Sequence, residues 1–72
     1  MFDIQNLDCE TIAYYWQRAR LCAESIWSAC YVGINIGQAK LDQNWLRQWV
    51  KEAREAGLLY NGRYDEFITM KL

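Results

Sequence analysis

The side chains that could carry chemistry are few, and they are not spaced as catalytic groups. The 72 residues contain no histidine, so a nucleophilic serine or cysteine would lack its usual general base. Asp65 and Glu66 are neighbours on an expected strand, where their side chains should point to opposite faces and cannot act as a paired acid and base. Ser25 and Ser28 are interpreted as helix-surface residues. We expect a protein that is not an enzyme.

The three cysteines, Cys9, Cys22 and Cys30, form no Cys-x-x-Cys pair, and one of them would stay unpaired in any disulfide scheme. On one helix, Cys22 and Cys30 would lie about 12 Å apart, which is beyond bridging distance. The chain also has no glycine-rich phosphate loop. We therefore expect reduced cysteines that serve as small core residues, no metal and no cofactor.

The location of the protein is predicted from what its sequence does not contain. The N-terminus lacks the positive region and apolar run of a secretory signal, and reduced cysteines are typical of the cytoplasm. No stretch approaches the roughly 20 apolar residues of a membrane span. We expect a cytoplasmic protein with no membrane partner.

The charge of the chain limits the partners that it could bind. A formal net charge of −1 and a pI of about 5.2 do not favour a protein that must hold a polyanion. Nine carboxylates against eight cations also cannot reproduce the phosphate array that a DNA mimic needs. The charge is uneven, since residues 37–72 carry six cations against five carboxylates while residues 1–36 carry two against four. A basic contact surface is therefore predicted in the second half.

A long first helix is predicted from about Cys9 to Val32. Asp8 is placed as its N-cap, and Leu7 can pack against Ile12 as a hydrophobic staple. Gly33 is expected to end it, and residues 33–37 to form a loop or a single helical turn. Apolar residues at helical spacing predict the stripe that faces the core, with two further residues at its edge. The stripe is Ile12, Trp16, Ala19, Ala23, Ile26, Trp27 and Cys30, and the edge residues are Tyr15 and Cys22.

A second helix is predicted from about Gln43 to Ala56, because Leu41-Asp42 repeats the staple and cap of the first, with Leu46 as the staple partner. Gly57 is expected to end it. Asn61-Gly62 favours a type I′ turn, so residues 58–70 are predicted to form a β-hairpin. The inward residues of this helix are predicted to be Leu46, Trp49, Val50 and Ala53. Residues 1–72 should thus form one mainly α domain, a long aromatic-rich helix packed on a second helix and closed by a short C-terminal β-hairpin.

Polar and basic residues follow the face of the second helix that lies away from its apolar stripe. Such side chains contact phosphates and base edges in a DNA groove, or an acidic patch on a protein. The alternative is a solvated helix face, blunted by pairing of Lys51 with Glu55. The candidate residues for binding a partner or a nucleic acid are Gln43, Asn44, Arg47, Gln48, Lys51 and Arg54, with Arg63 at the tip of the predicted hairpin.

A second candidate surface lies on the first helix, where Tyr14, Arg18 and Leu21 fall on the side away from the core stripe. Exposed aromatic residues together with arginine are typical of protein interfaces. The alternatives are that a C-terminal segment such as Phe67-Ile68 folds over them, or that they stay singly exposed.

Residues 41–68 resemble the latter half of a winged helix-turn-helix domain, in which a helix ending in Ala56-Gly57-Leu58-Leu59 is followed by a short hairpin. Trp49-Val50-Lys51-Glu52, followed by Gly62-Arg63-Tyr64, is also similar to small phage excisionases. The resemblance implies a winged-helix-like fold in which helix 43–56 enters the DNA groove and residues 60–63 rest on the backbone. The preceding helix of the motif would fall at 32–40, where Gly33 and Gly37 lie.

In size and aromatic content the chain also looks like the compact proteins that phages and mobile elements use against host machines, including anti-CRISPR inhibitors. Two functions are therefore predicted. The first is a non-enzymatic regulator or inhibitor that binds and occludes another protein. The alternative is a winged-helix-like, sequence-specific DNA-binding regulator, which would act as a homodimer joined through its first helix.

Overall fold

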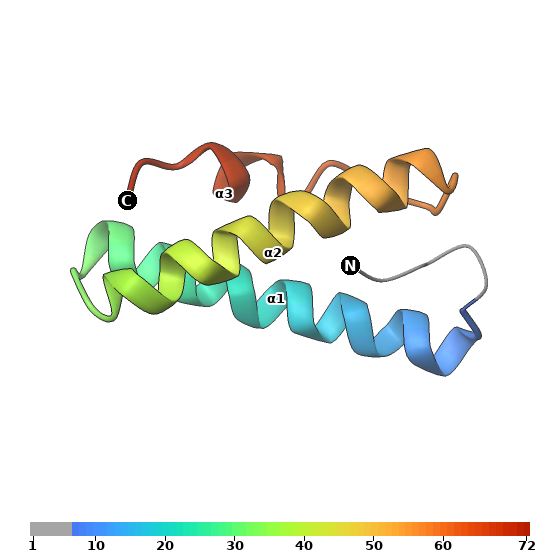
Figure 1. The fold of residues 1–72 in the computed structure, drawn as a ribbon, viewed down its shortest axis with the longest axis horizontal. Helices are drawn as coiled ribbons and strands as arrows, with labels where there is room; N and C mark the ends of the chain where they lie inside the picture. Colours follow the sequence, from blue (N-terminus) through green and yellow to red (C-terminus); the bar gives the residue numbers. More distant parts are fainter. Residues whose placement is uncertain (1–6) are drawn as a thin grey trace.

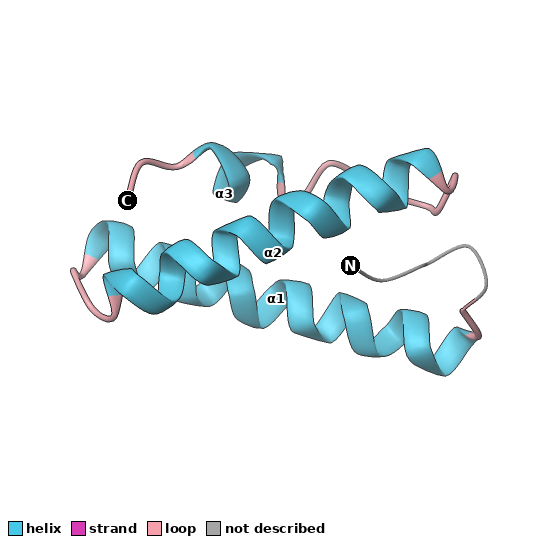
Figure 2. Ribbon diagram, in the orientation of Figure 1, coloured by secondary structure: helices cyan, strands magenta, loops and turns pink. Residues whose placement is uncertain are grey.

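The computed structural model describes residues 7–72, which form the helices α1 (Cys9–Tyr31), α2 (Ile36–Glu55) and α3 (Asp65–Thr69). The two long helices run antiparallel beside each other, and α3 lies in a segment that turns back along α2 and contacts both long helices (Figure 1). All of the regular structure in this part of the chain is helical (Figure 2). The predicted mainly α domain of two packed long helices is confirmed.

The boundaries of α1 follow its local signals. Asp8 is the N-cap, and its Oδ1 accepts a hydrogen bond of 2.7 Å from the backbone N–H of Thr11. Hydrogen bonding from Thr11 lowers the pKa of Asp8, and the side chain of Thr11 contributes more to this than its backbone N–H. At the other end, Gly33 has a φ of +80° and its N–H bonds to the carbonyl of Ser28 at 2.9 Å. Both predicted ends are confirmed to within a residue.

The predicted start of the second helix is wrong, because α2 begins at Ile36 rather than near Gln43. Asp42 lies inside the helix, is 9% exposed and accepts a hydrogen bond of 3.1 Å from Gln38 Nε2. Leu41 is 64% exposed, so it is not positioned as a buried staple. The extra turns pack Ala39 completely against the rest of the chain, and this tertiary contact outweighs the capping signal.

The end of α2 agrees with the prediction. Gly57 takes a φ of +74°, and the N–H of Leu58 bonds to the carbonyl of Ala53 at 3.0 Å, which is the closing contact of a glycine C-cap. The chain therefore reverses direction where the glycine was expected to end the helix.

The predicted C-terminal β-hairpin is wrong, and with it the wing of a winged-helix fold. No residue between 7 and 72 is in a strand, and the segment after Gly62 forms α3 instead. Asn61 and Gly62 do make a turn: Asn61 Oδ1 accepts from the N–H of Arg63 at 3.0 Å, and Gly62 has a φ of +73°. A two-stranded hairpin is marginal alone. Here the turn leads into a helix whose preceding residue, Tyr64, is buried in the core.

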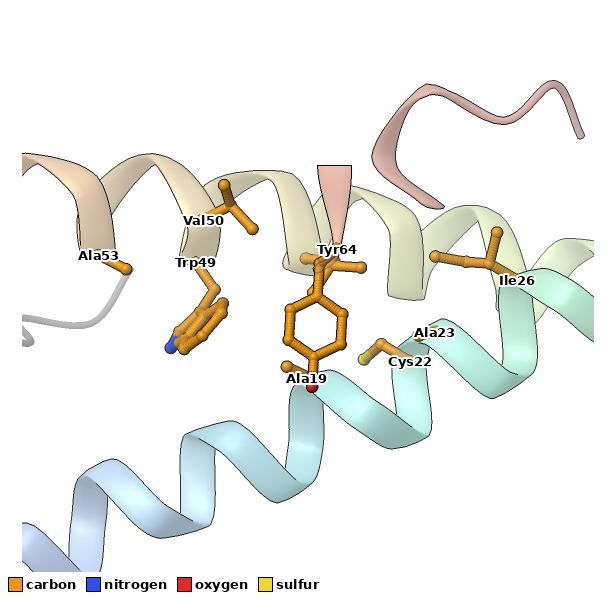
Figure 3. Packing of buried hydrophobic residues seen from close by; sticks show 9 residues of the cluster. Ala19, Cys22, Ala23, Ile26, Trp49, Val50, Ala53 and Tyr64 are labelled. Carbon is orange, nitrogen blue, oxygen red and sulfur yellow. The ribbon is translucent and has the colours of Figure 1, made fainter. Parts of the chain in front are cut away.

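The core lies between the two long helices and under Tyr64, whose ring points toward α1 (Figure 3). All four inward residues predicted on α2 are buried. On α1 the prediction fails at Trp27, which is 48% exposed, and at Cys30, which is exposed. Trp27 lies about 100° around α1 from the buried Ile26, and it lines a hollow with Tyr64 and Phe67 instead. The core consists of Ala19, Cys22, Ala23, Ile26, Leu46, Trp49, Val50, Ala53 and Tyr64.

Trp49 is the centre of an aromatic cluster and is fully buried. Its ring meets those of Trp16 and Tyr64 edge-on, with centroid distances of 4.7 and 6.0 Å, and stacks on that of Trp45 at 6.3 Å. Such pairs contribute about 0.5–1.5 kcal/mol each beyond the area they bury. The cluster joins both long helices to the C-terminal segment.

Candidate interaction surfaces

Gln43 belongs to the interior and not to an exposed recognition stripe. Its side chain is 6% exposed, and Nε2 donates to the carbonyls of Phe67 at 3.0 Å and Met70 at 2.7 Å. Its predicted exposure is therefore wrong, because the C-terminal segment folds along α2 and covers it. Both amide protons hold that segment in place.

Arg47 and Arg54 are also bonded to the C-terminal segment. Arg47 Nε donates to the carbonyl of Ile68 at 2.8 Å. Arg54 pairs with the carboxylate of Asp65, and its guanidinium lies 4.9 Å from the centre of the Tyr60 ring. Both partners of the ion pair are about half exposed, so the pair contributes at most about 1 kcal/mol. Both arginines are exposed, but each one is bonded to the C-terminal segment.

Tyr60 completes the contact at Asp65. Its hydroxyl donates to Asp65 Oδ1 at 2.9 Å. Burial, together with the hydrogen bond and charge of Asp65, raises the pKa of Tyr60 to about 12. The phenol is therefore a stable donor at neutral pH, and it helps to fix the loop that leads to α3.

The remaining predicted binding residues do not form one continuous surface. Gln48 Nε2 donates to Glu52 at 3.0 Å, and Asn44 and Lys51 are exposed on the outer side of α2. Arg63 lies elsewhere, beside Trp16 and Tyr64 in a hollow next to α1, with its guanidinium 6.0 Å from the Tyr64 ring. Because the predicted wing is absent, Arg63 is not aligned with the basic residues of α2.

Sequence reasoning missed a cationic cleft between the outer face of α2 and the C-terminal segment. Its volume is about 580 Å³, and Lys40, Arg47 and Lys71 line it together with Asn44 and Thr69. No acidic side chain is among its lining residues within the described part of the chain. Lys40 and Lys71 are far apart in sequence, and only the return of the C-terminal segment along α2 could reveal the cleft.

The predicted exposure of the first-helix surface is confirmed. Tyr14 and Leu21 are 55% and 52% exposed. Leu21 lies about 200° around α1 from Ala23, which lines the hollow under Tyr64 and Phe67. Phe67 therefore packs on a different side of α1, and the alternative that it covers this surface is excluded. The binding role of Tyr14, Arg18 and Leu21 stays a prediction.

Residues of α2 extend this surface. The Arg18 guanidinium lies 5.7 Å from the centre of the Trp45 ring, and the Tyr15 ring stacks on Trp45 at 6.0 Å. Leu41, one helical turn before Trp45, is 64% exposed. We call this combined surface the open face; it consists of Tyr14, Arg18 and Leu21 of α1 with Leu41 and Trp45 of α2.

The cysteines are all free thiols, but they differ in their surroundings. Cys22 is buried, and its burial together with the charge of Asp42 raises its pKa to about 11. A thiol with so high a pKa is a poor nucleophile at neutral pH. Cys9 and Cys30 are exposed at opposite ends of α1. The prediction of a small core cysteine is thus confirmed for Cys22 only.

No family model, curated protein or solved structure matches the chain. Within residues 7–72, no three cysteine, aspartate or glutamate side chains gather in a way that could hold a metal ion. None of the described helices has the length and apolarity to cross a membrane.

Proposed function

We propose that the protein is a non-enzymatic regulator or inhibitor that binds another protein through the open face and covers a site which that protein needs. The observation that carries this proposal is the exposure of two large apolar side chains, Tyr14 and Leu21, beside the arginine that lies over Trp45. Tyrosine, tryptophan and arginine are the residues that dominate the energetics of protein interfaces.

The open face is suited to binding because it is held in shape before a partner arrives. Its residues stand on two long helices that the Trp49 cluster locks together. Because the Arg18 side chain is already held against Trp45, it loses less rotamer freedom when a partner binds. A rigid surface of this kind inhibits by occlusion, in the manner of small proteins that mobile elements direct against host machines.

The test is affinity capture from the source cell with the tagged chain and matched variants. Leu21→Asp places a charge in the open face and should reduce recovery of the partner at least about tenfold. Leu59→Asp is the control, since Leu59 is 94% exposed and lies outside the open face. Far-UV circular dichroism should show unchanged helix content in both. Equal recovery with Leu21→Asp and Leu59→Asp would refute the proposed surface.

A second candidate function is binding of DNA or another polyanion, and the cationic cleft of Lys40, Arg47 and Lys71 is the observation that favours it. This would require a mode of contact other than a winged helix, since the predicted hairpin is absent from the described residues. Titration into labelled duplex should give affinity that falls steeply with salt and that Lys71→Glu reduces. Absence of binding at low salt would remove this candidate.

A further inference from the structure

The end of the two-helix hairpin has no charge. Residues 25–39, which span the end of α1, the connecting turn and the start of α2, contain no Asp, Glu, Lys or Arg, although 24% of the chain is charged. We call this region the hairpin tip. Depletion of charge is a property of the buried centre of protein interfaces rather than of ordinary solvated surface.

The large apolar side chains of the hairpin tip face outward. Trp27 and Tyr31 are 48% and 62% exposed, and their rings lie 5.3 Å apart. Ile34 and Ile36 are 50% and 43% exposed. Together with Val32, these residues expose on the order of 500 Å² of apolar surface, which is near the upper limit for the largest patch on a monomer.

The hairpin tip has few buried residues of its own. Beyond Ile26 on α1 and before Asp42 on α2, the only buried residues are Ala29 and Ala39. The opposite half of the molecule is built around Trp49 and the aromatic rings that meet it. The tip thus turns its large side chains away from its own core, and a chain of this size commonly gains stability through oligomerisation.

We propose that the hairpin tip is a self-association surface, covered by the same surface of a second copy of the chain in a two-fold symmetric dimer. The hairpin tip is complementary to itself, because none of its own side chains carries a charge that a second copy would have to pair; the charged Arg20, Glu24 and Arg63 lie at its edge beside Trp27. About 500 Å² of apolar surface per copy, enlarged by the polar rim of Ser28, Asn35 and Gln38, reaches the lower end of the range for specific interfaces. The dimer is independent of the function proposed for the open face.

A membrane surface is a less favourable occupant than a second copy. The net charge is −1 and the hairpin tip itself contains no Lys or Arg, so only the neighbouring cationic cleft of Lys40 and Lys71 can attract anionic headgroups.

Sedimentation velocity over a concentration series tests the dimer. The unchanged chain should pass from monomer to dimer, and Tyr31→Asp should raise the dissociation constant at least about tenfold. Ile34→Asp provides a second variant at another exposed position. Leu59→Asp and the open-face variant Leu21→Asp should leave the dissociation constant unchanged. A chain that stays monomeric up to about 1 mM, or a dimer that only Leu21→Asp disrupts, would overturn the proposal.

The exposed cysteines allow an independent test. Cys30 lies in the hairpin tip, and Cys9 lies about 32 Å away along α1. A short bismaleimide should cross-link two copies of Cys9→Ser through Cys30, and should fail with Cys30→Ser. The reverse result would place the contact elsewhere. Flotation of a monomeric chain with phosphatidylcholine vesicles, weakened by Tyr31→Asp, would identify a membrane as the occupant and overturn the dimer.

Discussion

Replacing Gln43 by leucine should loosen the C-terminal segment while leaving the two long helices packed. The amide of Gln43 donates to the carbonyls of Phe67 and Met70, 24 and 27 residues away in sequence. Leucine has a similar size and cannot donate. The carbonyl of Phe67 keeps a hydrogen bond of 3.4 Å from the N–H of Met70, so the loss falls mainly on the carbonyl of Met70.

The expected destabilisation is about 1–2 kcal/mol, since each net hydrogen bond contributes about 0.5–1.5 kcal/mol and one acceptor keeps a partner. A chain of this length has a total stability of roughly 4–11 kcal/mol. The melting temperature should therefore fall by roughly 4–16 °C. A change of this size is readily measured and should not unfold the protein.

The assay combines urea denaturation with amide hydrogen exchange. Gln43→Leu should increase exchange at Ile68 and Met70 more than at residues of α1, because the segment opens locally before the protein unfolds. Asn44→Ala is the control at the next, exposed position, and it should change stability by less than about 0.5 kcal/mol. A Gln43→Leu protein with unchanged stability and unchanged exchange near α3 would refute the structural role of Gln43.

Three further outcomes are expected. Trp49→Ala should cost about 3–5 kcal/mol in urea denaturation followed by circular dichroism, whereas Trp27→Ala, at a half-exposed position, should cost well under half as much; equal losses would contradict the assignment of the core. The pKa of Cys22 is raised from 9.0 to about 11, so the stability that the neutral thiol contributes is fully present below pH 9 and is lost as the pH rises to 11. In urea denaturation at a series of pH values, Cys22→Ala should reduce this alkaline loss of stability by on the order of 2 kcal/mol. Parallel curves of stability against pH for the two proteins would argue against this role of Cys22. Asn35 has a φ of +52°, a left-handed conformation that glycine adopts more easily than alanine, so Asn35→Ala should destabilise the protein by about 1 kcal/mol and Asn35→Gly by much less. Thermal melts in which the two variants behave alike would mean that α2 does not begin there.

The features that could be predicted from the sequence depend on residues close to one another in the chain. Asp8 caps α1 through Thr11, and Gly57 ends α2 through contacts within five residues. The buried side of α2 repeats at the helical period and includes Leu46 and Trp49. Local chemistry alone is sufficient in each of these cases.

The start of α2 could not be predicted in this way, because Leu41-Asp42 carries the same local signal as Leu7-Asp8. Asp8 is exposed at the end of a helix, whereas Asp42 is buried, acts on the pKa of Cys22 in α1 and accepts a hydrogen bond from Gln38 of the preceding turn. The burial of Ala39 stabilises those preceding turns of α2. The outcome depends on a neighbouring helix, which a capping pattern does not report.

The fate of the C-terminal segment depends on contacts that are more distant still. Asn61-Gly62 specifies a turn, and the sequence allows either a strand or a helix after it. Burial of Tyr64 and the pairing of Asp65 with Arg54 are both possible only when α2 is already in place. A short helix of five residues is stabilised by these contacts rather than by its own propensity.

The same contacts explain why the two sides of the helical hairpin differ in the groups that they expose. The C-terminal segment binds Gln43, Arg47 and Arg54, which removes them from the set of freely exposed groups that a groove-reading helix would present. It leaves Tyr14 and Leu21 exposed, because it packs on another side of α1. In a winged helix the C-terminal segment would support DNA binding as a wing, but here it packs along α2, the helix that was predicted to read DNA. For this reason we favour protein binding through the open face over sequence-specific DNA binding by α2.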